Sequence, residues 1–155
     1  MFNGLTITFF GAALCATLAC IGSAIGVQSA GRAAAGVVSE KPELFGKMLI
    51  LQALPGTQGI YGFLIAVLTL VFSGAMGGGA ADLTMQQGWM FWFAGLPTGI
   101  VGLLSGMMQG RTAVAAIHMT AKQPDASAKG ITMTALVETY AILALLVSIL
   151  ILISI

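Results

Sequence analysis

The chain has 155 residues, of which 58% are hydrophobic and 7% are charged. Soluble globular domains carry about 25% charged residues, so this composition excludes a water-soluble domain and favours a lipid bilayer as the solvent. The formal net charge is +1, and the absence of a basic patch in the sequence argues against nucleic acid as a partner.

The first half of the chain contains two long apolar segments, residues 5–38 and 44–76. Each is longer than the ~20 residues that a membrane-spanning helix needs. A polar turn, residues 39–43, separates them, and Pro42 stands where a second helix is expected to begin. We therefore predict one helical hairpin over residues 1–80.

The second half has the same organisation. Apolar segments over residues 88–119 and 131–155 flank a polar turn at residues 122–125, and the glycine run 77–79 separates the two halves. We predict a second hairpin over residues 81–155. The predicted fold is an all-α membrane protein with four transmembrane helices.

All six cations lie near the two polar turns, within residues 32–47 and 111–129. Because cytoplasmic loops of membrane proteins are enriched in lysine and arginine, we expect the loops Glu40–Glu43 and Gln123–Asp125 to be cytoplasmic. Both termini would then lie outside. Trp89 and Trp92 would lie near the outer membrane interface.

The two halves align with each other at an offset of 82 residues. Pro42 aligns with Pro124, and Ser23, Thr57 and Ile60 also meet identical residues. This pattern predicts a parallel internal repeat. One mismatch places Gly56 opposite Glu138, so the duplicated unit carries a single carboxylate at this position.

Glu138 is the residue with the clearest chemical implication. It lies 17 residues before the C-terminus, about 25 Å along a helix, and no charged residue follows it. A charge at the bilayer centre costs roughly 3 kcal/mol or more, so this carboxyl must be protonated or paired with a cation. The alternative is a neutral acid that makes a hydrogen bond between packed helices.

Polar residues in two other predicted helices could complete a cation site. Pro55 removes a backbone donor and frees carbonyls in the preceding turn, while Gln58 and Tyr61 share a helix face with Leu54. Gln109 lies in the third apolar segment, where an interhelical hydrogen bond is the alternative role. A hard alkali cation needs several oxygens to replace its water. The predicted ligands are the Leu54 carbonyl and the side chains of Thr57, Gln58, Gln109 and Glu138, with Tyr61 holding the carboxylate.

Small residues recur on one face of two predicted helices. In the third helix these are Gly95, Gly99, Gly102, Gly106 and Gly110, and in the first they are Gly22, Gly26, Ala30 and Ala33. Such faces allow close helix approach in membranes. We predict that the first and third helices form the crowded inner wall of a ring, with packing inside one chain as the alternative.

Three motifs in order, Leu54–Gly62 (LPGTQGIYG), Gln109-Gly110 and Leu136–Ile142 (LVETYAI), carry a family resemblance over essentially the whole chain. The sequence resembles the membrane-rotor proteolipid of V-type rotary ATPases, the c or K subunit. It is most similar to the bacterial sodium-transporting form. In that form the ion ligands match the five residues predicted above, and Tyr61 matches the gating tyrosine.

This resemblance implies a ring of identical subunits in the plasma membrane. The ring would turn against a stator subunit (a or I), whose essential arginine displaces the ion from the carboxylate. The central-stalk d or C subunit would dock on the loops Glu40–Glu43 and Gln123–Asp125. The cargo would be Na⁺, with Li⁺ or H⁺ as competing ions. ATP hydrolysis would take place in another part of the machine, because this sequence contains no phosphate-binding loop.

Three other functions stay open. A proton-transporting rotor would keep Glu138 but not need the full set of polar ligands. A self-contained secondary carrier would also have intramembrane polar residues, but normally more helices. An enzyme is disfavoured, since the single histidine, His118, has no evident nucleophile beside it in the pattern.

Overall fold

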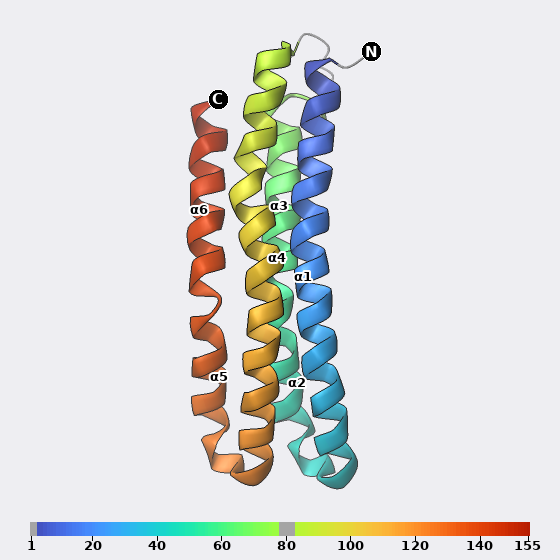
Figure 1. Cartoon of the computed structure of the whole chain (residues 1–155), viewed down its shortest axis with the longest axis vertical. Helices are drawn as coiled ribbons and strands as arrows, with labels where there is room; N and C mark the ends of the chain where they lie inside the picture. Colours follow the sequence, from blue (N-terminus) through green and yellow to red (C-terminus); the bar gives the residue numbers. More distant parts are fainter. Residues whose placement is uncertain (1–2, 78–82) are drawn as a thin grey trace.

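The computed structural model describes residues 3–77 and 83–155. Four helical spans run side by side, with the N- and C-termini at one end of the bundle and both tight turns at the other (Figure 1). The described residues form helices and turns and no strand, which confirms the all-α prediction. The predicted boundary between residues 80 and 81, Gly78, Gly79 and Asp82 lie outside the described residues.

The first two spans are α1 (Gly4–Glu40) and a second span made of three pieces. After the turn η1 (Pro42–Leu44) follow α2 (Phe45–Ala53), the 3₁₀ turn η2 (Leu54–Gly56) and α3 (Thr57–Phe72). Asn3 caps α1, because its side chain accepts a hydrogen bond from the Thr6 amide at 2.9 Å. The predicted polar turn is confirmed, with Pro42 at its start.

The third span is one long helix, α4 (Met85–Lys122), and the fourth is again composite. It contains η4 (Pro124–Ala126), α5 (Ser127–Leu136) and α6 (Thr139–Ser154). Helix α4 begins earlier than the predicted residue 88, because Thr84 and Gln87 form a capping box. The expectation of one continuous fourth helix is wrong, since Val137 and Glu138 form a turn between α5 and α6.

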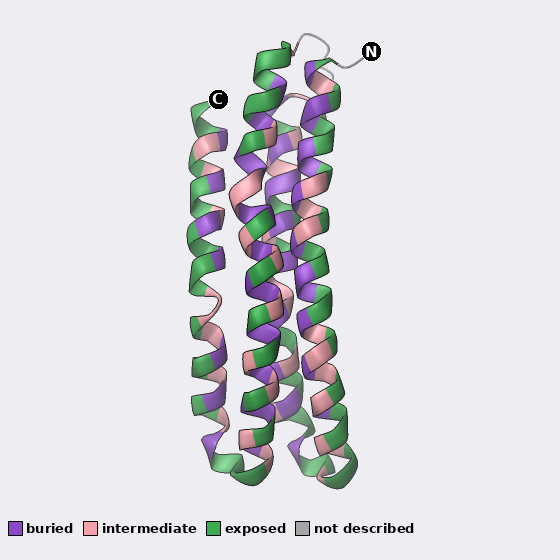
Figure 2. Ribbon diagram, viewed as in Figure 1, coloured by how far each residue is buried: buried purple, intermediate pink, exposed green. Residues whose placement is uncertain are grey.

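All four spans are long and apolar enough to cross a membrane. The 37 residues of α1 extend over about 55 Å, whereas the hydrocarbon core of a bilayer is about 30 Å thick. The helices therefore project beyond the hydrocarbon, as predicted from the segment lengths. The composite fourth span is the least covered, and α5 and α6 present much exposed surface in Figure 2.

The small-residue faces bring α1 and α4 into backbone contact. A Cβ added at Gly110 would lie 2.4 Å from the Gly26 Cα, and one added at Gly106 would lie 2.7 Å from the Gly22 carbonyl carbon. Both distances are too short for real contacts, so glycine is required there. One predicted member is wrong: Ala34, not Ala33, is buried in the core against α4. The α1–α4 packing within one chain thus uses these faces.

Two lysines of the first hairpin bind the turn of the second. The Lys41 ammonium donates to the Ala121 carbonyl at 2.6 Å, and the Lys47 ammonium donates to the Pro124 carbonyl at 2.8 Å. These bonds compensate carbonyls that the end of α4 leaves without helical partners. They join the two hairpins at the end of the bundle that holds both tight turns.

Candidate ion-binding site

The 3₁₀ turn η2 interrupts the second span at the predicted proline. Pro55 is buried, and it stands between Leu54 and Gly56. The Leu54 carbonyl accepts hydrogen bonds from the Thr57 amide and, at 3.1 Å, from the Thr57 hydroxyl. The expected irregular backbone is therefore present, and its carbonyl oxygen lies beside the first predicted ligand side chain.

Two amide side chains meet in the interior, where both are fully buried. The Gln58 Nε2 donates to the Gln109 Oε1 at 2.5 Å and to the Ser105 Oγ at 3.2 Å. The Gln109 Nε2 in turn donates to the Thr134 carbonyl at 3.1 Å. The Gln58 Oε1 accepts from the Thr57 hydroxyl at 3.5 Å. These contacts orient both amide groups.

The Glu138 carboxyl lies at the turn between α5 and α6 and is half-buried in the single chain. Its Oε1 accepts a hydrogen bond from the Tyr61 hydroxyl of α3. The turn is tightened by two i−3 backbone bonds, from the Val137 amide to the Thr134 carbonyl at 3.3 Å and from the Glu138 amide to the Ala135 carbonyl at 3.0 Å. The helix break therefore sets the position of the only acid in this span.

The six predicted residues form two hydrogen-bonded groups. One contains Leu54, Thr57, Gln58 and Gln109, and the other is the pair of Tyr61 and Glu138. Across the described residues, Tyr61 is the hydrogen-bond partner of the Glu138 carboxylate, while the amides bind each other. For both amide oxygens to face one cation, the Gln109 oxygen must exchange its bond with Gln58 for the ion.

Ser105 connects these two groups, and the sequence prediction did not include it. Its hydroxyl accepts from Gln58 and donates to the Val137 carbonyl at 3.2 Å, next to Glu138. The internal repeat offered a signal, since Ser23 aligns with Ser105. Ser23 binds the second span of its own half, where its Oγ accepts from the Gly59 amide at 2.7 Å.

The turn at Glu138 was also missed, although the repeat contained it. The offset of 82 residues places Val137 and Glu138 opposite Pro55 and Gly56, and both pairs lie at helix breaks. Proline explains the first break. In the second, side chains of α4 bind the carbonyls of Thr134 and Val137, so tertiary contacts satisfy the backbone where the helix is interrupted.

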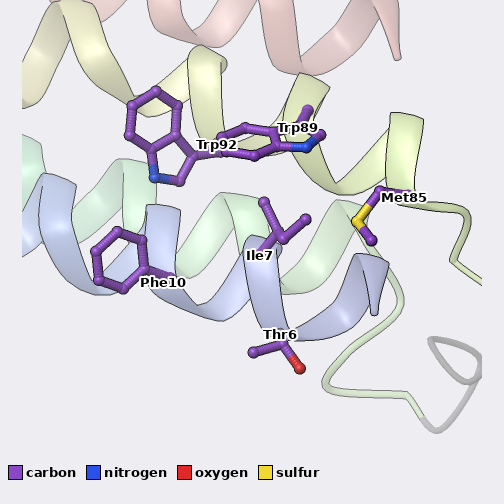
Figure 3. A pocket seen from close by; sticks show the side chains of 6 residues that line it. All are labelled: Thr6, Ile7, Phe10, Met85, Trp89 and Trp92. Atoms are coloured by element: carbon purple, nitrogen blue, oxygen red, sulfur yellow. The ribbon is translucent and has the colours of Figure 1, made fainter. Parts of the chain in front are cut away.

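The chemistry of this site is that of one carboxylate among neutral oxygens. Over residues 3–77 and 83–155, no group of three or more histidine, cysteine or acidic side chains is placed to hold a metal ion. Such an arrangement suits a monovalent cation or a proton better than a divalent metal, which usually receives several charged ligands. A cavity of about 700 Å³ lies elsewhere, between α1 and the start of α4, and its lining is apolar (Figure 3).

The fold and the site define a class: a membrane protein of helical hairpins with a carboxyl group in the middle of one span. The family of the ATP synthase C subunit matches residues 10–69 and again residues 92–151. The two matches start 82 residues apart, the offset of the internal repeat. The chain belongs to the ATP synthase C-subunit family.

Relatives from bacteria, archaea and fungi agree with this assignment. The V-type sodium ATPase subunit K of Enterococcus hirae is 48% identical over 83% of this chain and 78% of its own length. The A-type ATP synthase subunit K of Methanocaldococcus jannaschii is 45% identical over 94% of this chain and 63% of that protein. The c′ subunit of the V-type proton ATPase of Saccharomyces cerevisiae is 36% identical over 75% and 70%. The resemblance to the V-type ATPase proteolipid is confirmed.

Proposed function

We propose that this chain is the ion-carrying rotor subunit of a V-type ATPase and that each copy carries one Na⁺ at Glu138. The observation that carries the proposal is the Tyr61–Glu138 hydrogen bond, which holds a half-buried carboxylate at a helix break. The buried amides of Gln58 and Gln109 lie on the neighbouring helices. The name and 48% identity of the sodium ATPase relative support Na⁺ as the cargo.

The proposed site forms a neutral complex with a monovalent ion. The Glu138 carboxylate supplies the single negative charge, and the oxygens of Leu54, Thr57, Gln58 and Gln109 replace the ion's water. A neutral complex avoids the cost of exposing a charge to lipid. When the subunit reaches the stator, an arginine of the a or I subunit competes for the carboxylate and displaces the ion. Rotation is driven by ATP hydrolysis in other subunits.

The two hairpins, residues 1–80 and 81–155, would act as parallel repeats with one ion between them. Gly56 occupies the position that corresponds to Glu138, at the equivalent helix break. A Cβ there would contact the Val27 Cγ2 at 3.6 Å, an ordinary distance, so steric exclusion does not explain the missing carboxylate. We propose a plasma-membrane ring with external termini. The loops Glu40–Glu43 and Gln123–Asp125 would meet the central-stalk d or C subunit in the cytoplasm.

Proton transport by the same rotor is the second candidate. The hydrogen bonds favour it in one respect, because the Gln58 and Gln109 amides bind each other and Tyr61 binds the carboxylate. A proton needs one good acceptor, which Glu138 alone provides. A fungal relative named as a proton ATPase subunit shares 36% identity with this chain.

Carbodiimide labelling of purified rings tests the two candidates together. The reagent modifies protonated buried carboxyls, so we expect Glu138 to be labelled and Na⁺ to slow the labelling at fixed pH, with Li⁺ acting similarly. Choline at the same ionic strength is the control. If pH alone changes the labelling rate, the carrier is a proton rotor. In the reconstituted ATPase, Glu138→Gln should abolish ATP-driven transport, and transport at the wild-type rate would exclude the proposed role of this residue.

A further inference from the structure

A second cavity, of about 540 Å³, lies between α1 and α4 at the end of the bundle that holds the two turns. Basic side chains gather around it: Arg32, Lys41, Lys122 and His118, with Glu40 as the acid among its lining residues. Counting histidine as neutral, three cations and one carboxylate leave this set with a formal charge of +2. Neither the ion site nor the contacts between hairpins use Arg32 or Lys122.

The wall of this cavity is apolar between the basic groups. Ala33, Val37 and Ala121 contribute to the lining. Lys41 is held in place, because its ammonium donates to the Ala121 carbonyl at 2.6 Å. Arg32 and Lys122 are exposed and remain available to a ligand. The cavity thus combines mobile cations with a surface that suits hydrocarbon.

The position along the helices places this cavity at the membrane interface. The lining residues of α1 run from Arg32 to Glu40, which is the last residue of the helix. A helix of about 55 Å exceeds the 40–45 Å that a bilayer occupies with its headgroups, so its final turns lie at headgroup level. The cavity at the opposite end of the same helix pair has an apolar and aromatic lining, including Trp89, Trp92 and Phe10 (Figure 3).

We propose that the basic cavity binds an anionic membrane phospholipid. Its phosphate would bind Arg32 and Lys122, since guanidinium groups match phosphate geometry and ammonium groups supply further charge. Its acyl chain would run from Ala33 and Val37 toward the membrane interior. Basic pockets between transmembrane helices on the cytoplasmic side are a known mode of anionic-lipid recognition. An acidic protein segment fits less well, because the lining is apolar between the cations.

The test uses assembled rings that are purified in detergent, stripped of lipid and titrated with phosphatidylglycerol or phosphatidylcholine under native mass spectrometry. The wild-type ring should retain phosphatidylglycerol in preference to phosphatidylcholine. In the Arg32→Gln/Lys122→Gln variant the concentration for half-occupancy should rise roughly 30-fold, since each basic residue contributes about fivefold near an anionic surface. The matched control Arg111→Gln/Lys129→Gln removes the same charge outside the cavity and should bind like the wild type. The mass of the ring verifies that each variant assembles.

Three results would overturn the proposal. Equal retention of the two lipids by the wild type would show that charge does not select the ligand. An equal loss in the cavity variant and the control would show a general effect of charge. Unchanged phosphatidylglycerol binding in the cavity variant, together with weaker binding of the central stalk, would assign the cavity to an acidic protein partner instead.

Discussion

The Tyr61 hydroxyl donates a hydrogen bond to the Glu138 carboxylate, and this contact joins the two hairpins of the chain. Tyr61 belongs to α3 in the first hairpin, whereas Glu138 lies at the α5–α6 turn in the second. The two residues are 77 positions apart in the sequence. The orientation of the carboxylate in one repeat is therefore set by a side chain of the other.

Substitution Tyr61→Phe should loosen the hold on the carboxylate without removing the aromatic ring. Hydrogen bonds to charged groups contribute about 1.5–3 kcal/mol, so the Na⁺ concentration that halves carbodiimide labelling should rise at least about tenfold. Tyr140→Phe is the matched control, since Tyr140 is the other tyrosine and is 68% exposed. An unchanged Na⁺ concentration in Tyr61→Phe would exclude a gating role for the hydroxyl.

Substitution Gln109→Leu removes an amide oxygen and breaks the bonds to Gln58 and to the Thr134 carbonyl. We expect protection of Glu138 by Na⁺ to weaken by about tenfold or more, because a buried polar partner loses its hydrogen bond as well. Labelling at low pH should persist, since the carboxyl remains. Gln28→Leu, on the exposed side of α1, is the control. If Na⁺ protects the variant normally, Gln109 only packs the helices.

Substitution Ser105→Ala tests whether this residue positions the turn that carries Glu138. It removes the bond to the Val137 carbonyl and an acceptor for Gln58, at a cost of about 1–3 kcal/mol for groups left unpaired. The ring should melt at a lower temperature in detergent, and its Na⁺ affinity should fall. Ser29→Ala, which loses a bond within its own helix, should change neither. A lower melting temperature with normal Na⁺ affinity would show that Ser105 stabilises the fold alone.

Substitution Gly110→Ala should disrupt the α1–α4 contact, because the added Cβ would lie 2.4 Å from the Gly26 Cα. Overpacking of this kind costs about 1–3 kcal/mol, so the assembled ring should dissociate at a lower temperature. Gly46→Ala is the control, since nothing lies within 4 Å of a Cβ at that position and alanine favours a helix. Equal thermal stability of the two variants would contradict the close packing of these helices.

Much of the fold was predictable because bilayer physics is simple. Long apolar segments must form helices in lipid, since each backbone polar group needs a partner there. Pro42 and Pro124 marked the tight turns, and Pro55 marked a helix break. The start of α4 was misplaced because the capping box of Thr84 and Gln87 is a short-range signal outside the apolar segment.

The sequence by itself determined the helical spans, the repeat and the lone carboxyl of Glu138, because hydropathy, proline and charge act locally along the chain. The tertiary structure alone decided how the side chains meet. It paired Gln58 with Gln109 and Tyr61 with Glu138, and it brought in Ser105. The helix break at Glu138 also belongs to this second group. No proline interrupts that span, and its carbonyls bind side chains of α4 that only packing brings within reach.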